Sequence, residues 1–145
     1  MTYKTLSRRQ AAILAAMARG LIPSGGPYFF LGAGDLESQW LPRVDYAVRR
    51  MPPMTRLGIK IMLRLMDYAL PLLTIKRLVS LTRLDNDRLV TVMGRAESLG
   101  ALGAAGVVVV KVLIFPAFYG QKEAQEAIGY SPRFPTPPYF EGLKE

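Results

Sequence analysis

The residue types that most often carry out acid–base, nucleophilic and metal chemistry are missing from this chain. Its 145 residues include no His and no Cys, which removes the commonest general base, the commonest metal ligand and the thiolate nucleophile. No Ser lies in a Gly-x-Ser-x-Gly turn, and none could be activated by a His. The composition therefore excludes ordinary hydrolytic triads, disulfide frameworks and cysteine-bound iron–sulfur or haem groups.

Two glycine-rich segments and one pair of carboxylates remain as candidates for ligand binding. Residues 32–34 and 100–106 lack the spacing of dinucleotide sites and the Lys-Ser/Thr ending of phosphate-binding loops. The small residues of 100–106 are instead expected to let another helix approach closely. Asp85 and Asp87 stand at a predicted helix start, where carboxylates favour the positive end of the helix dipole, so we interpret them as capping residues. We expect this chain to hold no catalytic residue, metal or cofactor.

Three basic residues form the clearest charged pattern. Arg56, Lys60 and Arg64 recur every four residues and therefore share one face of a predicted helix. That face could be merely solvated, or it could contact an acidic protein, lipid headgroups or nucleic acid, and the net charge of +8 does not choose among these. No helix-turn-helix pattern, RNP motif or dense basic run accompanies the charge, so we do not expect nucleic-acid binding.

Aromatic side chains are the best candidates for anchors of a protein interface, because they offer large contact area at low entropy cost. These candidates are Tyr28, Phe29, Phe30, Phe134, Tyr139 and Phe140. Each of them could instead pack in the core, and core packing is what we expect for Trp40. Half of all residues are hydrophobic and 21% are charged, which is more apolar than a small monomer needs. Some apolar surface is therefore expected to face a partner.

The pattern of caps, breakers and apolar spacing predicts an all-α fold. We expect a compact domain of about five to six helices over residues 1–130 and an extended, proline-rich arm over 131–145. Thr5 or Ser7 should cap the first helix, Asp35 the second, and Asp85 or Asn86 the helix that continues to about Ser98. The expected helices span about 7–19, 35–50, 54–70, 86–98, 100–118 and 121–128, with a short helical piece over 72–81.

Apolar spacing assigns the faces of these helices. In the second helix Leu36, Trp40, Leu41, Val44 and Val48 follow helical periodicity. In the third, an apolar stripe lies beside Met62 and Met66, and Pro71 is expected to end the helix. The stripe consists of Leu57, Ile61, Leu65 and Tyr68. In the helix from about residue 86, the inward side chains are expected to be Leu89, Val90, Met93 and Ala96.

The segment from 99 to 119 is the most ambiguous. Its run of four valines at 107–110 favours a strand by propensity alone. A lone strand would have no partner elsewhere in the chain, so we interpret 100–118 as a central buried helix. Lys111, three glycines and Pro116 interrupt the apolar stretch, which argues against a membrane span.

The first helix also has a superficial likeness to a twin-arginine export signal. Ser7-Arg8-Arg9-Gln10 precedes a short apolar stretch that ends at Arg19. We interpret these residues as the opening helix of the fold, and the sequence leaves the compartment open between cytoplasm and periplasm.

Several landmarks resemble the gluconate 2-dehydrogenase subunit 3 family, the small subunits of bacterial flavin-dependent gluconate and glucose dehydrogenases. The matching strings are GLIPSGG at 20–26, GAGD at 32–35, IFPAFY at 114–119 and IGYSP at 128–132. The resemblance covers roughly residues 6–132. The chain departs from the family in its unclear export signal and its more hydrophobic, Met-rich middle.

The resemblance implies a subunit without a cofactor of its own. Its partner would be a larger FAD-containing dehydrogenase of the glucose-methanol-choline (GMC) type, and a cytochrome or another electron acceptor could join the complex. In exported members the small subunit also acts as a chaperone-like carrier for its partner. We expect the helical body to cover an apolar patch of the large subunit and the arm from Pro132 to Phe140 to lie along it.

A membrane-binding module is the main alternative. It would use Arg56, Lys60 and Arg64 together with the apolar middle of the chain, and it would need no protein partner. A stand-alone enzyme built on Tyr and Arg is a further alternative, which turnover by the purified chain would reveal.

Overall fold

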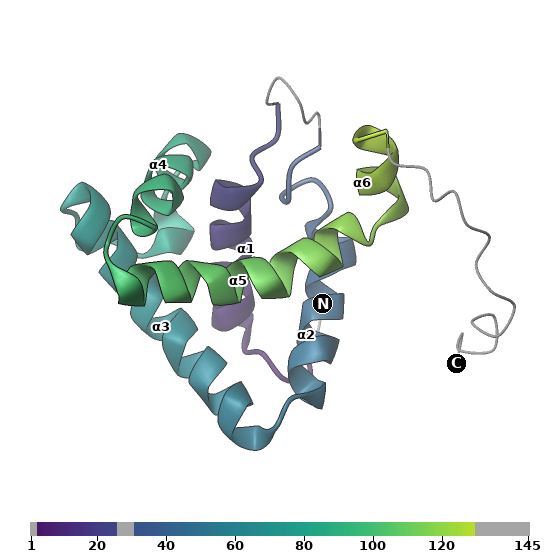
Figure 1. Ribbon diagram of the computed structural model, residues 1–145, viewed down its shortest axis with the longest axis horizontal. Helices are drawn as coiled ribbons and strands as arrows, with labels where there is room; N and C mark the ends of the chain where they lie inside the picture. Colours follow the sequence, from purple (N-terminus) through teal and green to yellow (C-terminus); the bar gives the residue numbers. More distant parts are fainter. Residues whose placement is uncertain (1–2, 26–30, 130–145) are drawn as a thin grey trace, which may run out of the picture.

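The computed structural model describes residues 3–25 and 31–129, and every regular element in these ranges is helical (Figure 1). The helices are α1 (Arg8–Leu21), α2 (Glu37–Arg50), α3 (Pro53–Ile75), α4 (Asn86–Ala96), α5 (Ala101–Tyr119) and α6 (Lys122–Ala127), with a 3₁₀ turn η1 (Leu81–Arg83) before α4. The all-α prediction is confirmed. The arm expected over 131–145 lies outside the described residues.

Helix α1 lies at the centre of the domain, where α2, α3, α4 and α5 contact it, and α6 packs against α5 (Figure 1). Its apolar side chains from Ile13 to Ala18 are all buried. Gly20 allows α4 to come close, because a Cβ at this position would lie 2.7 Å from the carbonyl oxygen of Leu89. Helix α5 crosses in front of α1 and packs against α2 (Figure 1).

Two sets of hydrogen bonds, one local and one from α2, fix the chain before α1. Ser7 caps the helix and forms a capping box with Gln10, as expected for one of the two cap candidates. The buried carboxylate of Asp45 on α2 accepts hydrogen bonds from the backbone N–H groups of Lys4, Thr5 and Leu6. These three bonds tie the start of the chain to α2.

Helix α2 buries the face that its periodicity predicts. Leu36, Trp40, Leu41, Val44 and Val48 are all buried, and the Trp40 indole N–H donates to the carbonyl of Ala33 at 2.8 Å. The predicted cap was wrong: the helix begins at Glu37, and the Asp35 carboxylate accepts from the N–H of Gly32 in the turn ahead of it.

Helix α3 is longer than predicted, because it continues through Pro71 to Ile75. Pro71 lacks the N–H that would donate to the carbonyl of residue 67, and the helix tolerates this loss where it is packed. The chain leaves the helix at Lys76, which has a φ of 58°. The helical piece expected over 72–81 is therefore wrong: its first residues belong to α3, and only the turn η1 follows.

The carboxylate of Asp67 holds this connection in place. It is fully buried and accepts from the Ser80 hydroxyl at 2.6 Å and from the Leu81 N–H at 3.0 Å. Arg9 of α1 pairs with it at 3.1 Å. One side chain thus joins α1, α3 and the segment before α4.

Helix α4 begins as predicted, with Asp85 accepting a hydrogen bond from the N–H of Arg88. It ends at Ala96, two residues before the predicted end. Val90 was wrongly assigned to the core, since it is exposed and Val92 is buried in its place.

Helix α5 contains the four valines, so the helical interpretation of residues 107–110 is confirmed. The prediction that this helix is buried at the centre of the domain is wrong. Only one side is buried, because α5 lies on the surface of the bundle, and that side consists of Gly106, Val107, Val110, Leu113, Ile114 and Phe118. After α6, Gly129 takes a φ of 70°, which ends the helix as predicted.

Candidate docking surface of α3 and α5

The outer side of α5 is apolar and exposed to solvent. Leu102, Val108 and Val112 expose 90%, 56% and 64% of their surface. The only charge on the helix, Lys111, is ion-paired with Glu97 at the end of α4. A helix that is apolar on all sides is normally buried on all sides, so the outer side of α5 has the composition of an interior.

Helix α3 has a second exposed apolar surface, the α3 ridge, formed by Leu57, Ile61, Leu65, Tyr68 and Leu72. These side chains are between 41% and 66% exposed. The core is contacted by a different side of the helix, which carries Ile59, Leu63, Met66 and Leu70. The stripe seen in the sequence is thus a surface feature of this chain.

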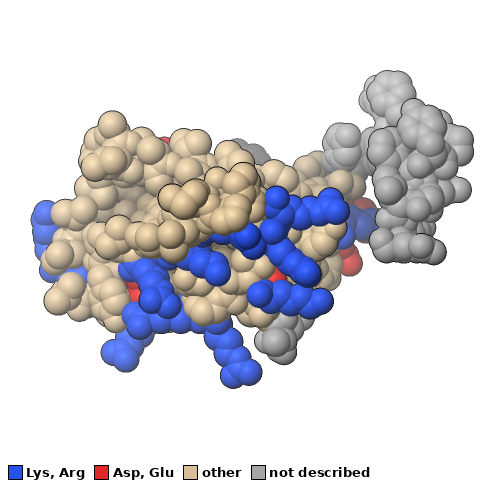
Figure 2. Space-filling model, turned by 90° about the horizontal axis from the view of Figure 1, so that it is seen from below, with Lys and Arg blue, Asp and Glu red and all other residues tan. Residues whose placement is uncertain are grey.

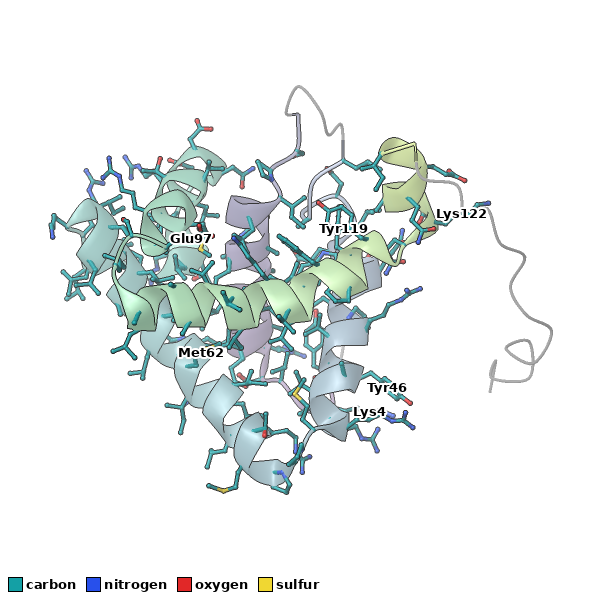
Figure 3. The ribbon with its side chains drawn as sticks, viewed as in Figure 1. Lys4, Tyr46, Met62, Glu97, Tyr119 and Lys122 are labelled. Atoms are coloured by element: carbon teal, nitrogen blue, oxygen red, sulfur yellow. The ribbon has the colours of Figure 1, made fainter. Side chains whose placement is uncertain are left out.

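An apolar groove runs between α3 and α5. It consists of two hollows of about 430 and 560 Å³, and the hollows share Gly58 and Met62 as lining residues. Met62 lies between the two helices (Figure 3). The first hollow continues to Val109 and Val112 of α5, and the second continues to Leu73, Leu102 and Gly103.

Small residues make this groove possible. A Cβ at Gly58 would meet no atom within 4 Å, so its missing side chain leaves the space open. A Cβ at Gly106 would lie 2.5 Å from the terminal methyl of Met66, so the missing side chain leaves room for the end of this Met side chain from α3. The groove floor is therefore set by glycine, and its walls are set by Leu, Ile, Met and Val.

Basic residues border the ridge on the side away from the groove. Arg56, Lys60 and Arg64 lie together on α3 as predicted, and none of them is ion-paired with a carboxylate among the residues that the structure describes. Figure 2 shows Lys and Arg gathered over one part of the molecule next to a broad surface without charge. The sequence grouped these three residues correctly.

Arg9 extends this basic row. Its guanidinium lies 5.7 Å from the centre of the Tyr68 ring and donates to the Tyr68 hydroxyl. Hydrogen bonds to Asp67 and Tyr68 raise the pKa of Arg9 above its usual value. Arg9 is thus held as a cation beside the α3 ridge.

The six aromatic candidates for interface anchors, Tyr28, Phe29, Phe30, Phe134, Tyr139 and Phe140, lie outside the described residues. The outer side of α5 was missed as a candidate surface, because an all-apolar segment was interpreted as a buried one. The sequence did hold evidence for this surface. Residues 101–119 have no polar side, and a small single domain would leave part of such a helix in contact with solvent.

Among the described residues, no group of three or more His, Cys, Asp or Glu side chains comes together that could hold a metal ion. By length and composition alone, α5 could cross a membrane, although about a third of it is buried against the rest of the domain.

Burial raises the pKa of the Tyr119 phenol, near the end of α5.

Comparison with known proteins gives no match, whether to a family model, a curated protein or a solved structure.

Proposed function

We propose that this chain is a non-catalytic small subunit that binds and stabilises a larger FAD-dependent dehydrogenase of the GMC type. The observation that carries the proposal is the apolar groove with the exposed outer side of α5. Monomeric proteins rarely leave contiguous apolar patches larger than a few hundred Å². A partner that covers this surface would bury the outer side of α5, as expected for a helix that is apolar on all sides.

The shape of the groove favours a protein partner. From Thr55 to Leu73 it follows α3 for roughly 27 Å, at 1.5 Å per residue, which is the length of about five helical turns. An apolar helix of the partner can lie in such a groove and contact both α3 and α5. Burying a Val or Leu contributes about 1.5–3 kcal/mol, so a few side chains at the centre could hold the pair together against the cost of association.

The class of the partner comes from the resemblance to gluconate 2-dehydrogenase subunit 3. In that arrangement the FAD belongs to the large subunit, this chain contributes no reacting group, and a cytochrome or another acceptor can take the electrons. Covering an apolar surface on each partner explains how such a subunit would act as a chaperone, since either chain alone would expose surface that favours aggregation.

Co-purification tests the proposal. The chain is expressed alone and together with the proteins encoded beside it, and the eluate is examined for a second protein and for flavin absorbance. We expect a flavoprotein to elute with the chain and to be insoluble or inactive without it. A chain that stays a soluble, flavin-free monomer when its neighbours are present contradicts the proposal.

Two glycine variants locate the contact. Gly58→Leu fills the groove, and Gly94→Leu places the same side chain on α4; neither position has an atom within 4 Å of an added Cβ. We expect Gly58→Leu to lose the flavoprotein and Gly94→Leu to retain it. Equal retention by both variants would exclude the groove as the docking site.

A further inference from the structure

Two shallow hollows lie along the basic side of α3. One, of about 220 Å³, is lined by Gln10, Leu57, Lys60, Ile61 and Arg64. The other, of about 190 Å³, is lined by Pro53, Arg56, Leu57 and Lys60. Each hollow therefore combines two cationic side chains with the apolar surface of Leu57, and Lys60 takes part in both.

A ligand that suits these hollows carries a negative group joined to an apolar body. We propose that the basic side of α3 binds the headgroup phosphates of an anionic phospholipid bilayer, with the α3 ridge entering the interface between headgroups and acyl chains. Leu57, Ile61 and Leu65 are each at least half exposed and supply the apolar contact. Lys60 and Arg64 flank that contact and can reach the phosphates with their long side chains.

The charge of this surface is complementary to an anionic bilayer. Arg56, Lys60, Arg64 and Arg9 form one row, and the carboxylate of Asp67, which pairs with Arg9, is fully buried. The row lies beside the exposed apolar side chains of the α3 ridge, since Leu57 and Ile61 line the same hollows as the cations. A nucleic acid would use the cations and leave the apolar ridge uncovered, so a lipid surface fits both features.

This site does not depend on the flavoprotein. The basic side and the groove are on opposite sides of the α3 ridge, because Lys60 and Met62 are two residues apart on one helix, about 200° around its axis. Ile61 and Leu65 of the ridge also line the groove, so a bilayer and a partner in the groove would share these two side chains. The lipid site can be tested with the purified full chain alone.

The test is co-sedimentation with vesicles of phosphatidylcholine, with and without about 30 mol% phosphatidylglycerol. We expect binding only to the anionic vesicles, and we expect it to weaken as NaCl rises from about 50 to about 500 mM. Lys60→Gln with Arg64→Gln should weaken binding roughly 30-fold, since each basic residue contributes about fivefold near such a surface. Leu57→Gln with Ile61→Gln should also weaken it.

The matched control removes two charges elsewhere, with Arg88→Gln on α4 and Lys122→Gln on α6. We expect it to bind nearly as well as the wild type. Three results would overturn the lipid site: no binding to anionic vesicles at low salt, equal losses in the control and in the Lys60/Arg64 variant, or an unchanged affinity in the Leu57/Ile61 variant. Displacement by inorganic phosphate at constant ionic strength would also overturn it, because it would indicate a site for the free anion.

Discussion

The four consecutive valines of α5 offer a direct test of the surface described above. Val107 and Val110 are fully buried, whereas Val108 and Val109 are 56% and 37% exposed. Replacing Val110 by Gln places an amide in the core, and replacing Val108 by Gln places the same amide in solvent. The two variants have the same composition, so only the position of the side chain differs between them.

The expected magnitudes are far apart. Val110→Gln loses about 1.5–3 kcal/mol of apolar burial, and leaving the amide unpaired in the core costs about 1–3 kcal/mol more. We therefore expect a loss of about 3–5 kcal/mol. Val108→Gln buries nothing, and Gln has a helix propensity higher than Val by a few tenths of a kcal/mol. It should leave the free energy of unfolding within about 0.5 kcal/mol of the wild type.

Urea unfolding of the isolated chain, followed by far-ultraviolet circular dichroism, measures both values. A large loss in Val108→Gln would show that the outer side of α5 is already covered in the isolated chain, for instance by a second copy. Tolerance of Gln at 108 and 110 together with sensitivity at 107 and 109 would indicate a strand, since strand side chains alternate with a period of two.

Three further predictions concern the core and its titration. Asp67→Ala should lower the free energy of unfolding by about 3–5 kcal/mol, because the Leu81 N–H would be buried without its partner and the Ser80 hydroxyl would keep only its contact with Thr82. A loss below about 1 kcal/mol in urea unfolding would contradict this. Gly20→Ala should destabilise by about 1–3 kcal/mol through its clash with the backbone of Leu89, whereas Gly94→Ala should stabilise by up to about 1 kcal/mol. Thermal unfolding would contradict the close packing of α1 and α4 if both variants gained stability. Burial raises the pKa of Tyr119, so the stability contributed by its neutral phenol is present below pH 10 and is lost as pH rises through the raised pKa. The free energy of unfolding of Tyr119→Phe should therefore fall less than that of the wild type between pH 8 and pH 11. An equal fall in both proteins would assign the alkaline transition to other groups.

Local rules were sufficient for much of the fold. Ser7 and Asp85 cap helices because a short polar side chain at that position satisfies a free N–H, whatever the tertiary structure. The periodicity of α2 identified Trp40 and its neighbours as core, because that helix has one apolar side only. These features depend on residues three or four positions apart, which a sequence displays directly.

Other features depend on how helices are placed, and these were not predictable. Helix α3 is apolar on two sides, so the sequence could not tell the core side at Leu63 from the exposed ridge at Leu65. Pro71 was expected to end the helix, but packing around it holds the helix together for four more residues. Val90 and Val92 are both apolar, and the direction of α4 decides which of them is buried.

Photo-crosslinking from the outer side of α5 tests the docking proposal most directly. A photoreactive phenylalanine analogue replaces Val112, at 64% exposure, in cells that also express the proteins encoded beside the chain, and the control carries it at Val90 on α4. We expect position 112 to crosslink to a flavin-containing protein and position 90 to give no such product. A flavoprotein complex that forms normally and crosslinks from position 90 but not from 112 would contradict docking through α3 and α5.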